Sequence, residues 1–168
     1  MKKLHELLIA VLIIIGFSFS NLSCIEKEED PGPISIKNSI TPTNVNSGST
    51  IIWEITVTNS GGKVEIEKIH VKEEFISGWA EGLGTVELDL PISNITVDAH
   101  STKSIYSKTV PVYNTGSTDI KTQNTVTVYS NGGNETDIAI YTIKKSSNKS
   151  NEINFNSLLH RNICDLIE

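Results

Sequence analysis

The stretch from Ser49 to Phe75, STIIWEITVTNSGGKVEIEKIHVKEEF, places the strongest constraint on how this chain folds. Its first half carries apolar side chains at alternate positions, namely Ile51, Trp53, Ile55 and Val57. A two-residue period is typical of a strand with one face in a core and the other in water. The segment Asn59 to Gly62 then supplies residues that tolerate positive φ. The stretch therefore predicts two long antiparallel strands joined by a turn.

The second half of this stretch changes its phase. Val64 and Ile66 belong to one alternation, whereas Ile69, Val71 and Phe75 belong to the other. A strand keeps its apolar face inward across such a change only when one extra residue is inserted. We therefore expect a β-bulge near Glu67-Lys68; the alternative is that one strand ends there and another begins.

Five further segments alternate in the same way, each bounded by Gly, Pro, Asn, Asp or Ser. They are Ile34 to Ile40, Val86 to Leu90, Lys103 to Val112, Ile120 to Tyr129 and Thr136 to Ile143. About seven short strands at near-regular spacing indicate an all-β antiparallel β-sandwich over residues 34–144. The phases place seven side chains in its core: Trp53, Ile55, Val57, Ile69, Val71, Val126 and Val128.

Residues 1–23 have the pattern of a signal peptide. A basic start, Met1-Lys2-Lys3, precedes an apolar run of 13 residues from Leu7 to Phe19. A bilayer-spanning helix needs about 20 residues, so this run fits an export leader better than a transmembrane helix. We expect an exported protein.

Leu22-Ser23-Cys24 resembles the end of a prokaryotic lipobox, in which the cysteine becomes the lipidated first residue. Residues 24–33 are acidic and broken by two prolines, which is typical of a solvated lipoprotein tether. The resemblance implies that acylated Cys24 anchors the protein in membrane lipid. The protein would then face outward, at the cell surface or in a periplasm.

A second cleavage site, after Ser20, stays open. Cutting there would leave Cys24 as a free thiol. In an oxidising compartment it could then pair with Cys164, the other cysteine of the chain. Lipidation and this disulfide exclude each other, because an acylated sulfur cannot form the bridge.

The segment Val57-Thr58-Asn59-Ser60-Gly61 resembles a pattern of immunoglobulin-like modules in prokaryotic cell-surface proteins. These are the CARDB-type adhesion-related domains and the conserved-repeat surface domain. A later turn of that family usually has glycine where this chain has His100. The resemblance covers most of residues 34–144. It implies an immunoglobulin-like fold in a module with a structural, adhesive or protein-interaction role, an unidentified protein or glycan partner, and no catalysis.

Residues 145–168 differ from the rest in pattern. A polar linker is followed by apolar residues three or four apart, at Phe155, Leu158, Leu159, Ile163, Leu166 and Ile167. This spacing predicts a short amphipathic C-terminal helix. A helix of that length is marginal alone in water, so it would dock on the sandwich, meet a partner or stay frayed.

Chemistry-bearing residues are dispersed along the chain. His5, His70, His100 and His160 lack partners at metal-ligand spacing, so we expect no metal site and no cofactor. Nucleophile elbows and phosphate-binding loops are also missing, so we expect a protein that is not an enzyme. The remaining catalytic candidates are the carboxylates of Glu73, Glu74, Asp89 and Asp98, which could pair as in a glycosidase. The net charge of −6 argues against nucleic-acid binding.

Trp79 lies in a loop with Gly78, Gly82 and Gly84, where it could stack on a sugar or peptide. It could equally anchor the loop at the edge of the sandwich. The stacking role supports an alternative function, a small carbohydrate-binding module. Candidate glycosylation sites, in a host that glycosylates exported proteins, are Asn94, Asn134 and Asn148.

Overall fold

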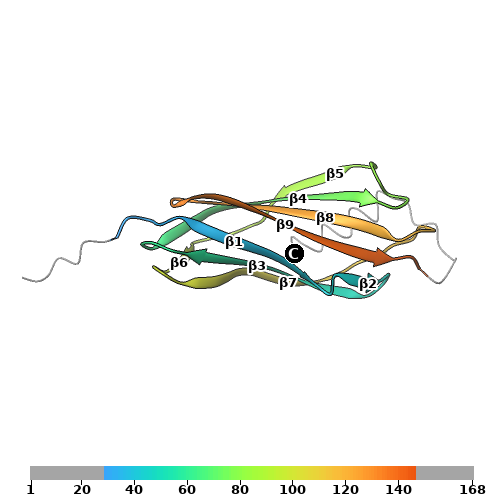
Figure 1. Cartoon of the computed structure of the whole chain (residues 1–168), viewed down its shortest axis with the longest axis horizontal. Coiled ribbons are helices and arrows are strands. Elements are labelled where there is room, and N and C mark those ends of the chain that lie inside the picture. The colour runs from blue at the N-terminus through green and yellow to red at the C-terminus, as the bar shows by residue number, and fades with distance from the viewer. Residues whose placement is uncertain (1–28, 147–168) are drawn as a thin grey trace, which may run out of the picture.

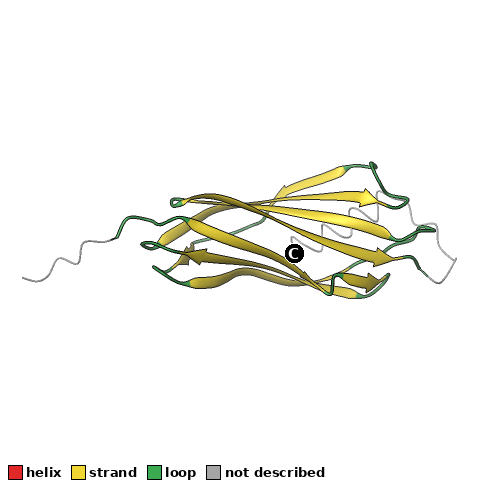
Figure 2. Ribbon diagram, in the orientation of Figure 1, coloured by secondary structure: helices red, strands yellow, loops and turns green. Residues whose placement is uncertain are grey.

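The computed structural model describes residues 29–146, which form an all-β domain of two sheets (Figures 1 and 2). The smaller sheet has the order β1-β3-β7. The larger has the order β2-β9-β8-β4-β5, with β6 also pairing with β4. The strands are β1 (Ile34–Thr41), β2 (Asn44–Asn46), β3 (Thr50–Asn59), β4 (Val64–Ser77), β5 (Thr85–Asp89), β6 (Ile95–Val97), β7 (Thr102–Pro111), β8 (Ile120–Ser130) and β9 (Gly133–Lys144).

These nine strands exceed the predicted seven by β2 and β6, each only three residues long. The predicted signal peptide and the predicted C-terminal helix lie outside the described residues, as do Cys24, Asn148 and Cys164. Residues 29–146 contain no helix, and therefore none with the length and apolar character needed to cross a bilayer.

The glycine turn between β3 and β4 carries the chain from one sheet to the other. β3 pairs with β1 and β7, whereas β4 pairs with β5, β6 and β8. The two strands predicted to be neighbours therefore face each other across the core. A true hairpin joins β8 and β9, with Ser130 opposite Gly133.

The β-bulge in β4 is confirmed. The pairing with β8 shifts register between Ile66 and Lys68, while β4 itself runs unbroken from Val64 to Ser77. Apolar side chains before and after the shift are buried. The extra residue therefore keeps both halves of this strand facing the core.

All seven side chains predicted for the core are buried, each with 2% or less of its surface exposed. Trp53 lies edge-on to Tyr106 of β7, with ring centroids 4.9 Å apart. Such aromatic contacts add about 0.5–1.5 kcal/mol to the effect of burial. The core between the sheets is therefore built around β3, the first strand of the Ser49 to Phe75 stretch.

One side of the sandwich is closed by β1, β2 and β9. The chain leaves the smaller sheet after β1 and joins the larger one as β2, which pairs with β9 in parallel. Asn44, Val45 and Asn46 lie opposite Thr142, Ile143 and Lys144. The prediction of an entirely antiparallel sandwich is wrong at this point, because the chain crosses between sheets without reversing direction.

Two of the outermost strands on the other side, β5 and β7, resist further pairing. β7 has an extra residue, Ile105, where its register with β3 shifts, and it carries Lys103, Lys108 and Pro111. β5 is five residues long and exposes Glu87 and Asp89. Bulges, lysines, prolines and short charged strands all discourage another strand from adding to an edge.

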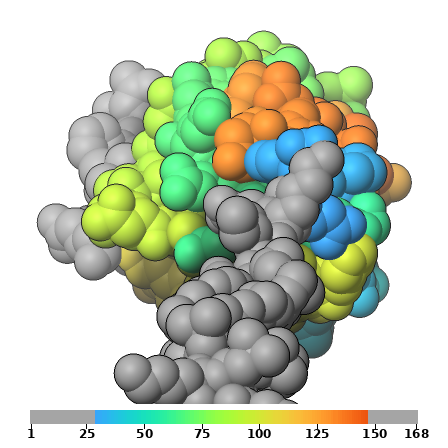
Figure 3. Space-filling model, turned by 90° about the vertical axis from the view of Figure 1, so that its left-hand side faces the viewer, coloured from blue at the N-terminus to red at the C-terminus, as the bar shows by residue number. Residues whose placement is uncertain are grey.

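The described residues begin and end at opposite ends of the long axis (Figure 1). We call these the entry end, near residue 29, and the exit end, near residue 146. The turns 59–63, 98–101 and 130–133 gather at the entry end, which Figure 3 views face-on. The loops 77–85 and 112–119 lie at the exit end.

Candidate functional site

Asn59 joins two turns at the entry end. Its side-chain amide donates to the carbonyl oxygens of Gly62, at 2.8 Å, and Asp98, at 3.0 Å. Its Oδ1 accepts from the backbone N–H of Gly61 at 3.1 Å. Only 1% of Asn59 is exposed, so these bonds satisfy a buried amide. The asparagine of the Val57 to Gly61 pattern therefore fixes the turn between the sheets.

Glycines allow the incoming chain to lie directly on these turns. A Cβ added to Gly32 would collide with the backbone of Gly61. A Cβ added to Gly132 would collide with the carbonyl oxygen of Gly32. Three backbone segments thus meet where only glycine fits.

Hydrogen bonds hold residues 29–33 in place. Gly62 donates its N–H to the carbonyl of Asp30 at 3.0 Å, and the Ser60 hydroxyl donates to the carbonyl of Pro33 at 3.0 Å. Pro31 and Gly62 form a parallel bridge. The part of the predicted tether that the structure describes therefore lies against the domain.

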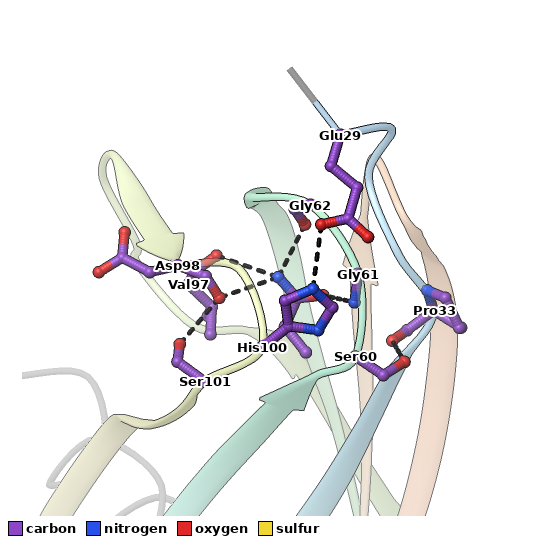
Figure 4. Close-up of polar contacts among 10 residues, drawn as sticks. Glu29, Pro33, Ser60, Gly61, Gly62, Val97, Asp98, His100 and Ser101 are labelled. Atoms are coloured by element: carbon purple, nitrogen blue, oxygen red, sulfur yellow. Dashed lines mark hydrogen bonds and ion pairs between the residues drawn. The ribbon is translucent and has the colours of Figure 1, made fainter. Parts of the chain in front are cut away.

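His100 adds a side-chain contact to the same cluster, with its Nε2 3.0 Å from a carboxylate oxygen of Glu29 (Figure 4). Its φ is 49°, in the left-handed region. Glycine adopts that region without steric cost, which fits the glycine usual at this place in the resembling modules. From this position the imidazole of His100 reaches Glu29 of the incoming chain.

Trp79 is the corresponding anchor at the exit end. Its indole Nε1 donates to Oδ1 of Asn114 at 2.8 Å, and its ring packs against Gly116, where a Cβ would collide with it. Asn114 is fully buried and donates to the carbonyls of Thr118 and Ile143. This geometry is that of a loop anchor. The role of Trp79 in sugar stacking stays a prediction.

A chain of polar side chains crosses the core between the sheets. Trp53 Nε1 donates to Oδ1 of Asn38 at 2.8 Å, and the Asn38 amide donates to Oδ1 of Asn124 at 2.9 Å. Within the larger sheet, the Tyr141 hydroxyl of β9 donates to the carboxylate of Glu73 in β4 at 2.8 Å. Beside these groups lies a cavity of about 10 Å³, room for about one water molecule.

Glu73 points inward, in phase with Val71 and Phe75. Burial raises the pKa of this carboxyl, while hydrogen bonds from Tyr141 and Asn124 act in the opposite direction. The pKa of Tyr141 is raised well above its ordinary value by burial, and further by the charge of Glu73. The Glu73 carboxyl and the Tyr141 hydroxyl therefore hold their protons more tightly than the same groups do in water.

The other carboxylates considered for catalysis do not gather around Glu73. Glu74 is on the opposite face of β4, where it pairs with Lys72. Asp89 lies 2.8 Å from Nδ1 of His70 and 3.0 Å from Lys68 Nζ, and these two hydrogen bonds lower the pKa of Asp89. His70 lies on the outer face of its strand, between the inward-facing Ile69 and Val71. Asp98 is in a turn at the entry end.

Within residues 29–146, no three His, Cys, Asp or Glu side chains cluster so as to hold a metal ion. Two candidate glycosylation sites are described, and both are exposed. Asn94 has a φ of 51° in the loop before β6, and Asn134 lies at the start of β9.

Sequence reasoning missed the roles of Asn38, Glu73 and Asn114. Two of these residues left a signal. Asn38 shares the phase of Ile34 and Ile40, and Glu73 shares that of Ile69 and Val71. A polar residue in the apolar phase of a strand predicts an interior hydrogen bond, since an unpaired group there is costly. Asn114 lies in a loop, where residues do not alternate, so no sequence signal pointed to its role.

Comparison with known proteins gives no family. No family model matches the chain, and no curated protein matches it. Among solved structures, the sporulation control protein Spo0M of Bacillus subtilis is similar, with 10% identity and a TM-score of 0.45. The alignment covers 67% of this chain and 50% of Spo0M.

Two other solved structures are also similar. The Pseudomonas fluorescens DNA glycosylase AlkC matches with 13% identity and a TM-score of 0.46, over 67% of this chain and 31% of AlkC. A CARDB domain from Pyrococcus furiosus, in complex with di-metal ions, matches with 11% identity and a TM-score of 0.37. That match covers 69% of this chain and 94% of the domain. Similarities this weak assign no activity.

Proposed function

We propose that the chain is a lipid-anchored, immunoglobulin-like surface module with a structural, adhesive or protein-interaction role and no catalytic chemistry. It would be related in type to the CARDB and conserved-repeat surface domains. The observation that carries the proposal is the attachment of residues 29–33 to the entry end, because it gives an anchor at Cys24 a fixed point on the domain.

The length of the chain before this attachment supports a short standoff from the membrane. Four residues, 25–28, separate Cys24 from Glu29. Fully extended, that distance is at most about 18 Å. An acylated Cys24 would therefore hold the entry end close to the bilayer and direct the exit end, with its loops 77–85 and 112–119, away from it.

The uses of the buried amides also support a structural role. The amides of Asn59 and Asn114 donate to backbone carbonyls of neighbouring turns, and Asn114 also donates to a carbonyl of β9. Such bonds shape loops and keep these two buried amides engaged within the domain. Asn114 does this at the exit end. There the loop 77–85 exposes Leu83, with 48% of its surface accessible.

The anchor is tested by the intact mass of protein purified from its native membrane fraction. We expect a mature chain that begins at Cys24, carries acyl mass and partitions into detergent. Cys24→Ser should release the protein from membranes, while Cys164→Ser, the matched control, should leave it anchored. A soluble chain that begins at Asn21 and contains a Cys24–Cys164 disulfide would contradict the proposal.

The interaction role is tested by recovering the protein from detergent-solubilised native membranes and identifying what co-purifies by mass spectrometry. Leu83→Asp, at the exit end, should reduce recovery of a genuine partner. Ile138→Asp, an equally exposed isoleucine on the outer face of the larger sheet, serves as the control. Equal recovery with both variants would argue against a partner bound at the exit end.

A further inference from the structure

The first and last strands of the domain run side by side in the same direction. β1 and β2 lead away from the entry end, and β9 also runs from the entry end to the exit end (Figure 1). β2 pairs directly with β9 in parallel, and Thr142 donates its N–H to the carbonyl of Thr43 at 2.8 Å. A pull that separates the two chain ends therefore acts along the axes of these strands.

The direction of the pull decides how the hydrogen bonds fail. When two paired strands are drawn past each other along their length, all bonds between them carry the load together. When a hairpin is opened from its free end, the bonds break one after another. In this domain, end-to-end tension draws β1 past β3, through eight register pairs, and β2 past β9, through three.

The core opposes sliding as well. Displacement of β1 by one residue would turn Ile34 and Ile40, both 5% exposed, out of the interior. Displacement by any distance would also break the contacts of Asn38, which ties β1 to three other strands. It bonds to Trp53 of β3 and Asn124 of β8, and its backbone N–H donates to Asp137 of β9 at 2.8 Å.

The entry end adds a second resistance in series. Residues 29–33 cross the turn of Gly61 and Gly62 in a parallel bridge, and Gly32 is held between Gly61 and Gly132. Tension on the N-terminal segment meets this contact before it reaches β1.

We infer that this domain is a load-bearing element, in which β1, β2 and β9 form a shear clamp that transmits tension between its two ends. The inference rests on the proposed anchoring role for the origin of the load, since tension needs a fixed end. The mechanical property belongs to the fold and can be measured without a membrane.

Single-molecule force spectroscopy tests the clamp on the chain from residue 24 to 168, with Cys24→Ser and Cys164→Ser and with tags at both ends. Forced unfolding reports the barrier along the pulling direction. We expect a single high-force event in end-to-end pulling. A second attachment, through Ser117→Cys and the C-terminus, loads the β8–β9 hairpin from its open end and should give a much lower force.

Two proline variants locate the resistance. Val45→Pro should lower the end-to-end force by roughly half, because proline removes a backbone donor from a three-residue pairing. Val86→Pro, in the short edge strand β5, should leave that force unchanged, since β5 lies outside the load path. Equal forces in the two pulling geometries, which need no variant of the clamp, would overturn the inference.

The mechanical result is separable from the anchoring result. A free Cys24 in the native protein would remove the proposed source of tension and leave the measured forces as they are. A low end-to-end force, together with a lipidated Cys24, would contradict the clamp and leave the proposed anchor standing.

Discussion

The indole nitrogen of Trp53 donates a 2.8 Å hydrogen bond to Oδ1 of Asn38 inside the core of the sandwich. The bond joins β3 to β1 within the smaller sheet, and Asn38 in turn reaches β8 of the larger sheet. Trp53 therefore contributes both to the apolar packing and to the polar network that Asn38 extends to the larger sheet.

Two substitutions separate these contributions of Trp53. Trp53→Ala should lower the free energy of unfolding by about 3–5 kcal/mol, because it leaves a cavity and an unpaired amide oxygen. Trp53→Phe keeps most of the packing and should cost about 1–3 kcal/mol, mainly for the lost donor. Chemical denaturation measures both. A Trp53→Ala protein as stable as the natural one would contradict the core assignment.

The inward carboxyl of Glu73 should make stability depend on pH in an uncommon direction. Its pKa is raised from an ordinary 4.5, so the folded state binds the proton more tightly than the unfolded state does. Stability should therefore be highest at or below about pH 4.5 for this group, and decline as pH rises through the raised pKa.

Glu73→Gln should flatten that decline and increase stability at neutral pH, as measured by urea denaturation across the range above pH 4.5. Glu74→Gln, on the outer face, is the matched control and should keep the decline. The lowered pKa values of Asp89 and Asp119 act in the opposite sense and only at lower pH, from an ordinary 3.8 downward. An unchanged slope in Glu73→Gln would contradict the prediction.

Removal of the Asn59 side chain should loosen the entry end. Asn59→Ala removes a buried amide that donates to the carbonyls of Gly62 and Asp98 and accepts from the N–H of Gly61, which should cost about 1–3 kcal/mol. Amide hydrogen exchange should accelerate in residues 97–101. Asn131→Ala, an exposed asparagine in the neighbouring hairpin, should have a much smaller effect. Equal losses of stability in Asn59→Ala and Asn131→Ala would contradict the prediction, because burial of Asn59 would then add nothing to the free energy of unfolding.

The two roles considered for Trp79 predict different outcomes for Trp79→Ala. If the residue anchors its loop, the melting temperature should fall, and Asn114→Ala should cause a similar loss of about 1–3 kcal/mol. If it binds sugars, glycan-array signal should vanish while the melting temperature stays constant. We expect the first outcome, since the indole nitrogen is already engaged by Asn114.

Much of the fold could be predicted because its strands alternate cleanly. The phase of Ile51 to Val57 identified the buried face, and the phase change after Ile66 located the bulge. Both follow from the strict two-residue period of a strand, in which an insertion has a visible effect. The partners of each strand could not be read in this way. The glycine turn after Asn59 allows either a hairpin or a crossing between sheets, and tertiary packing decides which one forms.

The polar interior escaped prediction for a related reason. Asn38 and Glu73 occupy apolar phases, where a single polar residue gives no sign of its partner. Their hydrogen bonds join residues 86 positions apart for Asn38 and Asn124, and 68 apart for Glu73 and Tyr141. Pairings over such separations depend on how the two sheets are placed, and the sequence pattern of one strand does not contain that information.

The blunted edges of β5 and β7 have a consequence for a protein held at a surface. Molecules confined to a membrane diffuse in two dimensions and meet at high effective concentration, with their flanks turned toward one another. The bulge at Ile105, the lysines and the final proline of β7 prevent such encounters from extending one sheet into the next. If the proposed anchor holds the protein at a membrane, neighbouring copies would therefore stand densely side by side and remain separate molecules.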